Sequence, residues 1–406
     1  MTSLDAKFAL LGTDHAPGQE VRQGDRSTAR QLRGEPLPGR PVDFSHGDVN
    51  ADAFPPAPGA LDAFVAGEQR GTGQAYTEYR GGGTLRELVA RRLTSFTGRP
   101  VTAEELILTP GTQGALFLAL GATVNAGDRV AIVRPDYFAN RKLVAFLGAE
   151  VVPVGLDYLG KSGKAGLDLA QLEGAFKSGV RTFVFSNPNN PTGVLYSADE
   201  LAAIAALANT YGVTVIADQL YARLVYSGHT FTHLAAAGIA PEQLLTIMGP
   251  SKTESLSGYR LGVAFGAAKL VERAEKLQAI VSLRAPGYSQ AVFQTWFDEP
   301  QGWLAERTAK HQAIRDDLVA LLRAVPGVAV RASEAGSYLF PRLPALTLPL
   351  HDFVRALRVQ ANVIVTPGTE FSPEATDSIR LNFSQNHPAA VDAVRRLIQM
   401  IERYRA

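Results

Sequence analysis

Residues able to do chemistry stand directly after several apolar runs of this sequence. A lysine, Lys252, comes shortly after the run LLTIM, and an aspartate, Asp218, directly follows VTVIA. The stretch SNPNNPTG at 186–193 places three asparagines after the run RTFVF. Such runs are typical of strands buried on both faces, and ligands of parallel sheets bind beyond the carboxyl ends of the strands. We therefore expect these side chains to belong to one site.

Lys252 is the candidate for covalent chemistry. Among the lysines of the chain, it alone follows a predicted buried strand. An amine that has lost part of its solvation beside a sheet edge is suited to Schiff-base formation or proton transfer. Considered alone, Lys252 is better explained as an ordinary solvated loop lysine, and Asp218 as a strand-end cap or an ion-pair partner.

A third feature makes the combination more specific. After the apolar run ELILT, the residues Gly111 and Thr112 open a predicted helix, whose first backbone N–H groups are free to bind an anion. Arg260, eight residues beyond Lys252, is a candidate bidentate partner for a phosphate. Pyridoxal phosphate requires an amine for its aldehyde, a carboxylate for its ring nitrogen and a seat for its phosphate. The sequence therefore predicts a pyridoxal phosphate site and no metal centre.

The elements that would position these residues alternate along the chain. From about residue 85 to residue 266, short continuous apolar runs alternate with longer amphipathic stretches. This pattern indicates an α/β fold with a mostly parallel sheet of seven-stranded type between two layers of helices. We expect an N-terminal segment at 1–45, partly joined to the small domain, a large cofactor-binding domain at 46–286, and a smaller α+β domain at 287–406.

Composition and charge favour a small-molecule ligand. The 406 residues carry 40 Lys and Arg against 39 Asp and Glu, so nothing predicts binding to nucleic acid or to an anionic membrane. The absence of cysteine excludes disulfides and thiolate chemistry. No apolar run approaches the roughly 18 residues of a membrane span, and the N-terminal run is too short for a signal peptide. We therefore expect a cytoplasmic protein.

The sequence resembles the class I and II aminotransferases of the aspartate aminotransferase fold, also called fold type I, from about Val42 to the C-terminus. Five segments carry the resemblance in the order of the family: YTEYRGGGTLRE at 76–87, SNPNNPTG at 186–193, ADQLY at 217–221, SKTESLSGYRLG at 251–262 and SIRLNFS at 378–384. One such segment alone is weak evidence, but several in register over most of the chain are specific.

The resemblance implies an enzyme that moves the amino group of an L-amino acid to a 2-oxo acid through a lysine aldimine, with ping-pong chemistry. It implies that Lys252 forms the aldimine and carries the proton. Asp218 would pair with the pyridine nitrogen, while Asn190 and Tyr221 would bind the phenolic oxygen of the cofactor. Tyr137 would stack on the cofactor ring.

The resemblance also implies where the anionic groups bind. The residues expected around the cofactor phosphate are Gly111, Thr112, Gln113, Ser251 and Arg260, together with Tyr76 of a neighbouring subunit. The substrate carboxylate would bind Arg380, beside Gly47 and Asn190. A tyrosine that reaches across subunits implies a homodimer with shared sites.

Three positions depart from the family pattern. Gly249 stands where a serine or threonine usually helps to bind the phosphate, and Gln219 replaces an acid that often follows the aspartate. Arg284 lies near the place where some members carry an arginine for a distal substrate carboxylate, but its offset from Pro286 does not match. We expect Arg284 to be a surface residue.

Other functions compete with transamination. A lyase or a decarboxylase of the same fold would use the same cofactor, because the protein selects which bond breaks. A remote alternative is nucleotide binding by GLDYLGKS at 155–162, a phosphate-loop pattern, but Gly163 and Gly166 interrupt the helix that must follow. We expect a surface loop there. His229 and His233 lack the nearby carboxylate of a metal site, and no glycine-rich nicotinamide fingerprint follows a strand.

Overall fold

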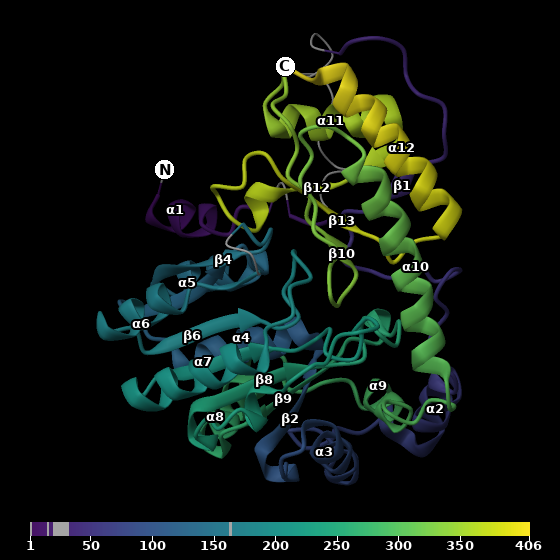
Figure 1. Ribbon diagram of the computed structural model, residues 1–406. Coiled ribbons are helices and arrows are strands. Elements are labelled where there is room, and N and C mark those ends of the chain that lie inside the picture. The colour runs from purple at the N-terminus through teal and green to yellow at the C-terminus, as the bar shows by residue number, and fades with distance from the viewer. Residues whose placement is uncertain (1, 14–15, 19–31, 162–164) are drawn as a thin grey trace.

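The structure, a computed structural model, describes residues 2–13, 16–18, 32–161 and 165–406. A larger body contains a central sheet with helices on both faces, and a smaller body contains the C-terminal helices (Figure 1). The long helix α10, Trp303–Arg323, runs from one body to the other. The helices of the larger body are α2 Ala60–Gly67, α3 Gly83–Thr97, α4 Gly111–Thr123, α5 Phe138–Phe146, α6 Leu169–Lys177, α7 Ala198–Tyr211, α8 Ala268–Val281 and α9 Gly287–Gln290.

The large sheet confirms the predicted α/β fold. Its strand order is β2-β9-β8-β7-β6-β3-β4-β5. Strands β3, β4, β6, β7 and β8 pair in parallel, whereas β9 is antiparallel to both of its neighbours and β5 is antiparallel to β4. The bounds are β2 Leu106–Pro110, β3 Arg129–Arg134, β4 Glu150–Asp157, β5 Gly166–Leu167, β6 Thr182–Ser186, β7 Thr214–Asp218, β8 Leu244–Met248 and β9 Leu261–Gly266.

Burial on both faces explains the continuous apolar runs of the strands. In β6, Phe183 and Phe185 belong to the apolar cluster that also contains buried residues of α6 and α7. Val184, between them, belongs to the cluster on the opposite face with residues of α4, α5 and α8. Because side chains alternate between the faces of a sheet, a strand covered by helices on both sides must be apolar at every position.

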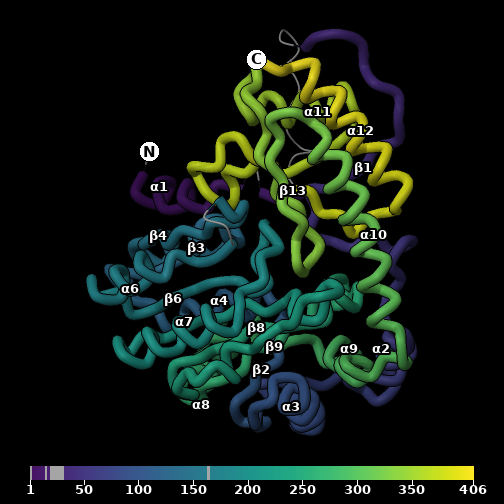
Figure 2. The backbone as a smooth tube through the Cα atoms, in the orientation of Figure 1, coloured from purple at the N-terminus to yellow at the C-terminus, as the bar shows by residue number. Residues whose placement is uncertain are grey.

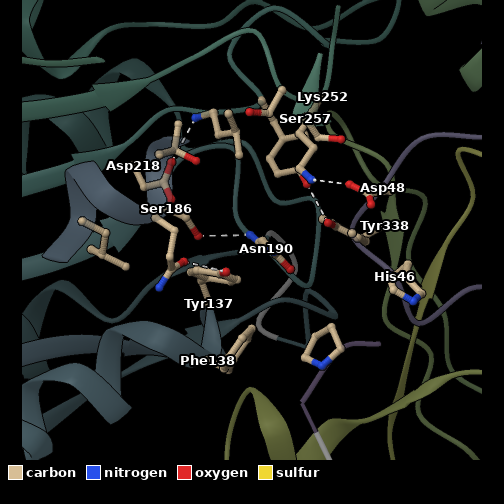
Figure 3. A pocket seen from close by; sticks show the side chains of 18 of the residues that line it. His46, Asp48, Tyr137, Phe138, Ser186, Asn190, Asp218, Lys252, Ser257 and Tyr338 are labelled. Atoms are coloured by element: carbon tan, nitrogen blue, oxygen red, sulfur yellow. Dashed lines mark hydrogen bonds and ion pairs between the residues drawn. The ribbon is translucent and has the colours of Figure 1, made fainter. Parts of the chain in front are cut away.

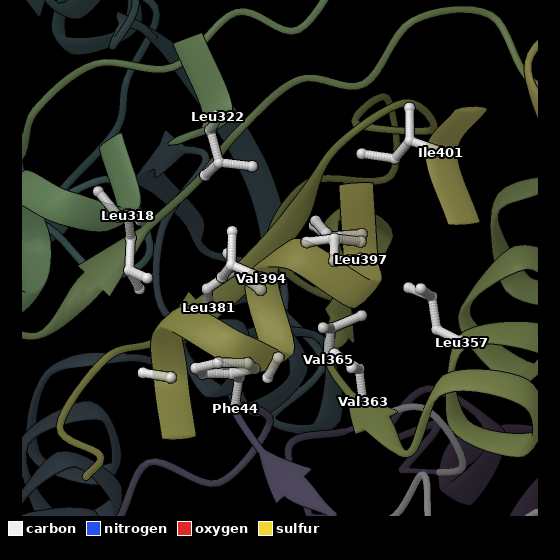
Figure 4. Close-up of a cluster of buried hydrophobic side chains, with 14 of the residues drawn as sticks. Phe44, Leu318, Leu322, Leu357, Val363, Val365, Leu381, Val394, Leu397 and Ile401 are labelled. Atoms are coloured by element: carbon white, nitrogen blue, oxygen red, sulfur yellow. The ribbon is translucent and has the colours of Figure 1, made fainter. Parts of the chain in front are cut away.

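The smaller body has its own apolar core. Its strands are β1 Val42–Asp43, β10 Tyr338–Leu339, β11 Val363–Ile364, β12 Thr366–Pro367 and β13 Ile379–Asn382, and its helices besides α10 are α11 Leu350–Ala361 and α12 His387–Tyr404. Strand β13 pairs antiparallel with β10 and β12. Buried side chains such as Phe44, Leu381 and Leu397 fill the space between these elements (Figure 4). They fix the position of β13, which carries Arg380.

The N-terminal segment joins the smaller body. Strand β1 pairs in parallel with β11, and the chain before it runs past α12 (Figure 2). Two arginines of α12 hold this stretch, because Arg403 donates to the carbonyl of Glu35 at 2.9 Å and Arg396 to that of Arg40 at 2.7 Å. The short helix α1, Ser3–Ala9, begins the described chain. The exact domain boundaries stay a prediction.

The segment 155–162, which matches the phosphate-loop sequence pattern, does not have the strand-to-helix structure of a phosphate loop. Gly155 to Asp157 form the end of β4, and Gly166–Leu167 return as the antiparallel strand β5. A strand running directly into a helix, which a phosphate loop requires, is therefore not present among the described residues of this stretch. Ser162 and Gly163 lie outside the described residues.

No described helix is both long and apolar enough to cross a lipid bilayer.

Candidate active site

A cavity of about 240 Å³ lies where the carboxyl ends of β6 and β7 face β10 and β13. Figure 3 shows Lys252, Asp218, Asn190, Tyr137 and Tyr338 around this one space. The structure brings together nearly all of the residues that the sequence predicted for the site. Those that line the cavity are Gly47, Thr112, Gln113, Tyr137, Asn190, Asp218, Tyr221, Ser251, Lys252, Arg260 and Arg380.

Lys252 lies on the wall of the cavity. It follows β8 by a short turn, and its side chain is only 16 % exposed. Its Nζ is 3.6 Å from Oδ1 of Asp48. Burial raises the pKa of Asp48, but the charge of Lys252 and a hydrogen bond with Ser257 together outweigh burial and lower the pKa. Gly47 also borders the amine, since a Cβ at this position would lie 3.5 Å from Nζ.

Asp218 ends β7 and presents a carboxylate without a cationic partner. Its Oδ1 accepts a hydrogen bond from the backbone N–H of Leu220 at 3.0 Å, and none of the described basic side chains forms an ion pair with it. Burial raises the pKa of Asp218 to about 6. A positively charged group placed beside this carboxylate would reverse that shift.

The amides of SNPNNPTG divide into two roles. The side chains of Asn187 and Asn189 hold the loop: Oδ1 of Asn187 accepts from the backbone N–H of Tyr196 at 3.3 Å, and Oδ1 of Asn189 accepts from the Thr192 hydroxyl at 2.6 Å. Asn190 instead lines the cavity, where its Oδ1 accepts a hydrogen bond from Arg380 at 3.1 Å. The loop therefore spends two amides on its own shape and presents the third to a ligand.

A buried carboxylate beneath this loop was missed by the sequence reasoning. Oδ1 of Asp136 accepts a short 2.5 Å hydrogen bond from the hydroxyl of Ser186, which itself accepts from the N–H of Asn190 at 3.1 Å. Burial raises the pKa of Asp136 to about 7. The chain Asp136–Ser186–Asn190 fixes the backbone that positions the Asn190 amide. The available signal was that Asp136 and Ser186 each stand at a strand end.

Arg380 is a buried cation without a counter-ion. Its residue is 1 % exposed, and its two terminal nitrogens donate to Asn190 and to the carbonyl of Ser45, the latter at 2.7 Å. Among the described residues, its Nε has no hydrogen-bond partner and no carboxylate forms an ion pair with it. The guanidinium lies against two aromatic rings, 4.3 Å from the centroid of Tyr338 and 4.7 Å from that of Phe371. A buried charge of this kind requires a partner of opposite sign.

Two tyrosine hydroxyls meet at the cavity. The hydroxyl oxygens of Tyr221 and Tyr338 are 2.6 Å apart, and the rings form an edge-on pair. Burial is the largest cause that raises the pKa of Tyr221, so this hydroxyl stays protonated. Sequence reasoning did not assign Tyr338 to the site, because its place there depends on contacts with Tyr221 and Arg380, which are distant in the chain.

The start of α4 forms a seat for an anion. Gly111 has φ +79°, and a Cβ there would lie 2.5 Å from Nη2 of Arg260, so the absence of a side chain lets the guanidinium approach the helix N-terminus. Gly262 in β9 is required for the same approach, since its Cβ would lie 2.5 Å from the backbone nitrogen of Thr112. Free N–H groups and an arginine together suit a phosphate.

Tyr137 and Gln113 form a pair on another part of the wall. The Tyr137 hydroxyl donates to Oε1 of Gln113 at 2.9 Å. Burial raises the pKa of Tyr137, so the ring is neutral. A neutral aromatic face beside the cavity is compatible with the predicted stacking.

Two of the departures from the family pattern have a structural reason. At Gly249, a Cβ would lie 3.0 Å both from the carbonyl oxygen of Leu261 and from Cγ2 of Thr112, so a serine or threonine would require these groups to shift. Gln219 is buried, and its Oε1 is 2.9 Å from Nδ1 of His233. Burial lowers the pKa of His233 to about 4, and a neutral imidazole is better matched by an amide than by a buried acid.

Tyr76 and Arg284 lie outside the cavity. Tyr76 is 79 % exposed, and the guanidinium of Arg284 is 4.3 Å from its ring centroid. Arg284 also donates to the carbonyl of Thr77. The guanidinium of Arg284 is also 4.7 Å from the ring centroid of Tyr79, which is exposed as well. Other large apolar side chains exposed on the larger body are Leu61, Val65, Ile280, Val281, Leu283 and Tyr288.

Comparison with known proteins decides the family. Residues 41–398 match the family model described as aminotransferase class I and II. The chain belongs to this family. A crystal structure of an aspartate aminotransferase from Rhodobacter sphaeroides 2.4.1 is 61% identical, with a TM-score of 0.94 over 100% of both chains. The resemblance seen in the sequence and the fold expected from it are confirmed, and the protein is an aminotransferase.

The names of two more distant relatives of this aminotransferase specify different amino donors. It is 27% identical to an aspartate aminotransferase of Sulfurisphaera tokodaii, over 80% of this chain and 82% of the relative. It is 25% identical to an arginine–pyruvate transaminase of Pseudomonas aeruginosa, over 92% of each chain. The family therefore establishes the type of reaction and implies pyridoxal phosphate.

The residues of the cavity fit this cofactor. The cavity combines a lysine amine, a carboxylate that lacks a cation, a helix N-terminus with an arginine, and a buried arginine that lacks an anion. These are partners for an aldehyde, a protonated ring nitrogen, a phosphate and a carboxylate, respectively. Metal chemistry has no comparable support: no set of three or more potential ligand side chains gathers in the described parts of the chain.

Proposed function

We propose that this aminotransferase holds pyridoxal phosphate in the cavity at the end of the large sheet and uses it to transfer an amino group from an L-amino acid to a 2-oxo acid. The bound cofactor would supply a ring that accepts electrons from the substrate α-carbon. Lys252, Asp218 and Arg260 would hold it through the aldehyde, the ring nitrogen and the phosphate. Asn190 and Tyr221 would bind its phenolic oxygen, and Tyr137 would lie against its ring.

The observation that carries the proposal is the pair of unmatched charges in one cavity. Among the described residues, the buried Arg380 cation has no carboxylate partner, and the half-buried Asp218 carboxylate has no cationic partner. Leaving either charge uncompensated destabilises the protein, so such groups are typical of binding sites rather than of a structural core. A zwitterionic substrate next to a protonated heterocycle supplies both missing partners.

The chain's own residues would then divide the work of proton transfer. The Nζ of Lys252, at the cavity wall, would accept the proton from the substrate α-carbon and donate it again to the carbon of the cofactor aldehyde. Arg380 and Asn190 would fix the substrate carboxylate, which orients the α-carbon toward Nζ. Asp218 would keep the ring nitrogen protonated through its negative charge.

Aspartate is the first amino donor to test. The support is the printed name of the 61%-identical structure from Rhodobacter sphaeroides and that of the Sulfurisphaera tokodaii relative. The arginine–pyruvate transaminase shows that the family also accepts other amino acids. A panel of amino donors and 2-oxo acid acceptors therefore has to accompany aspartate.

We further propose a homodimer with shared sites, in which Tyr76 of each subunit approaches the phosphate seat of the other. The support is the number of large apolar side chains that the larger body exposes, among them Tyr76, Ile280 and Tyr288. Apolar side chains exposed in such number are typical of a protein–protein interface. An open hollow is lined both by Arg260, the arginine of the phosphate seat, and by the exposed Tyr288.

The decisive experiment combines absorption spectroscopy with product assays. Purified protein with added pyridoxal phosphate should develop a near-visible band, which Lys252→Ala abolishes or shifts, and which aspartate bleaches in the wild type. Keto acid should appear together with the aminated cofactor. A colourless wild-type protein would contradict the site, keto acid without aminated cofactor would indicate a lyase, and CO₂ release would indicate a decarboxylase.

A further inference from the structure

Tyr338 contacts both Tyr221, which is expected to bind the cofactor, and Arg380, which is expected to bind the substrate carboxylate. Its hydroxyl oxygen is 2.6 Å from that of Tyr221, and its ring centroid is 4.3 Å from the guanidinium carbon of Arg380. The side chain is 2 % exposed and comes from β10 of the smaller body, whereas Tyr221 follows β7 of the larger one. A Cβ on Gly47 would lie 3.3 Å from the Tyr338 hydroxyl, so this hydroxyl also borders the cavity.

The two hydroxyls leave one proton without an acceptor. Each phenol carries one O–H, and a single hydrogen bond between them uses one of the two. Among the described residues, neither hydroxyl has a second hydrogen-bond partner. Because both side chains line the cavity, the remaining O–H is available to a ligand there.

The nearby cation indicates which hydroxyl donates to the other. A guanidinium over an aromatic ring attracts its π electrons and so strengthens the O–H of that ring as a donor. The guanidinium of Arg380 lies over the rings of Tyr338 and Phe371. No such contact is described between Arg380 and the ring of Tyr221. The Tyr338 O–H is therefore the one donated to Tyr221, which leaves the Tyr221 O–H for the ligand. Burial also raises the pKa of Tyr221, which keeps that proton in place.

We propose that Tyr338 is a positioning residue of this aminotransferase: its hydroxyl donates to Tyr221 and directs the Tyr221 O–H toward the cofactor oxygen, while its ring supports Arg380 for the substrate carboxylate. This inference rests on the proposed function. Hydrogen bonds in a chain polarise one another, so the donation from Tyr338 makes Tyr221 a stronger donor. A single side chain of the smaller body thereby acts on both the cofactor group and the carboxylate group of the site.

The first test is the pH dependence of the visible band in Tyr338→Phe loaded with pyridoxal phosphate. A hydrogen bond donated to an oxygen anion stabilises the deprotonated form, so a weaker Tyr221 donation raises the pH at which the proton is lost. Losing one hydrogen bond should raise the midpoint of the band change by about 0.3 to 1 pH unit. Binding of succinate, a carboxylate without an amino group, should change less than about twofold, because the ring remains.

A double-mutant cycle separates positioning from packing. Tyr221→Phe should raise the midpoint further than Tyr338→Phe, and Tyr338→Phe should have no added effect in the Tyr221→Phe background. Tyr338→Leu, which also removes the ring, should weaken succinate binding about 3- to 30-fold. The matched control is Tyr404→Phe, which removes a buried hydroxyl of the same body that donates to Gln360 at 2.7 Å. It should alter thermal stability but not the midpoint.

Two results would overturn the proposal while leaving the proposed function intact. In the first, Tyr338→Phe has the same pH midpoint as the wild type, although Tyr221→Phe shifts that midpoint. In the second, Tyr338→Phe shifts the midpoint by the same amount in the wild type and in the Tyr221→Phe background. Failure of the proposed function is distinguishable, because the wild type itself would then show no pH-dependent visible band. The thermal unfolding midpoints of Tyr338→Phe and Tyr404→Phe show whether each variant is folded. We expect Tyr338→Phe to fold, because the substitution keeps the aromatic ring.

Discussion

At the scale of single residues, Arg380 and Asp218 define what the cavity accepts. Each is a charge held by strand geometry, Arg380 in the middle of β13 and Asp218 at the end of β7. Neither position can relax toward solvent without breaking its strand. The two side chains therefore bind ligand groups of opposite sign at fixed places, and substitutions at them separate substrate binding from cofactor binding.

Arg380→Lys should reduce the use of amino acids much more than the retention of the cofactor. Lysine keeps the charge but loses the planar pair of donors that matches a carboxylate. Losing one charge-assisted hydrogen bond of about 1.5 to 3 kcal/mol should lower kcat/KM roughly 10- to 150-fold. Steady-state kinetics and a titration with pyridoxal phosphate measure the two effects. Equal losses in both would assign Arg380 to the structure of the site rather than to the substrate.

Asp218→Asn should change how the stability of the cofactor-free protein depends on pH. Burial raises the pKa of Asp218 from its ordinary 3.8 to about 6 in the folded state. Between these pH values the folded protein holds a proton that the unfolded chain has released, so its contribution is present below pH 3.8 and is lost as the pH rises through 6. Asparagine removes this loss, and the variant should gain about 1 to 3 kcal/mol relative to wild type above pH 6, compared with pH 4.

Urea unfolding of both proteins at several pH values measures this difference in the free energy of unfolding. Added pyridoxal phosphate should reverse the order at neutral pH, since the ligand gives the wild-type carboxylate its missing cation. An Asp218→Asn protein that gains nothing at neutral pH would show that the wild-type carboxylate is already compensated.

Residues that could be placed from sequence share one property: each follows a long, recognisable strand or lies in a segment of the family pattern. Lys252, Asp218 and Asn190 were placed in one cavity for this reason. Tyr338 and Asp136 were not assigned, because their importance depends on contacts between segments distant in the chain. The Tyr338–Tyr221 contact joins residues 117 positions apart.

At the scale of elements, the contact between β9 and the start of α4 determines the phosphate seat. The backbone of Gly262 in β9 packs directly against the backbone of Gly111 and Thr112, so any side chain on Gly262 would clash with these two residues. The apolar runs predicted both elements from sequence. The two-residue strands β1 and β5 could not be predicted, because so few residues establish no alternation and their pairing is set by the body around them.

Gly262→Ala should weaken the phosphate seat, and Gly258→Ala is the matched control. At Gly262, the added Cβ would lie 2.4 Å from the carbonyl carbon of Gly111, so the helix start must move. At Gly258, a Cβ would meet nothing within 4 Å. We expect Gly262→Ala to lose at least about tenfold in affinity for pyridoxal phosphate, equal to one lost phosphate hydrogen bond, and to lose less for pyridoxal, which has no phosphate.

Absorbance titrations with the two ligands measure these affinities. Gly258→Ala should bind both as the wild type does. If Gly262→Ala weakened both ligands equally, the contact would support the whole sheet edge rather than the phosphate seat.

At the scale of the whole molecule, the exposed apolar surface around Tyr76 is the main feature that a single subunit leaves unexplained. Tyr76, which was predicted to reach the phosphate of a neighbouring subunit, does not line its own cavity and is 79 % exposed. A second copy of the chain resolves both observations, because a symmetric interface would cover the apolar side chains and bring Tyr76 to the other subunit's seat. The family resemblance suggested both the residue and its place across the subunit interface, and this stays a prediction.

Hybrid dimers test this shared site. Lys252→Ala removes the amine, Tyr76→Ala removes the predicted phosphate partner, and each variant alone should be poorly active. If Tyr76 acts across the interface, a hybrid of the two variants contains one site with both residues intact and one site with neither. Random reassortment makes half of the dimers hybrid, so the mixture should regain about a quarter of wild-type activity per subunit. If Tyr76 acted within its own subunit, no hybrid site would be intact and mixing would restore nothing. Mixing each variant with itself is the control, and light scattering before and after mixing must give a mass near twice the 43.4 kDa chain.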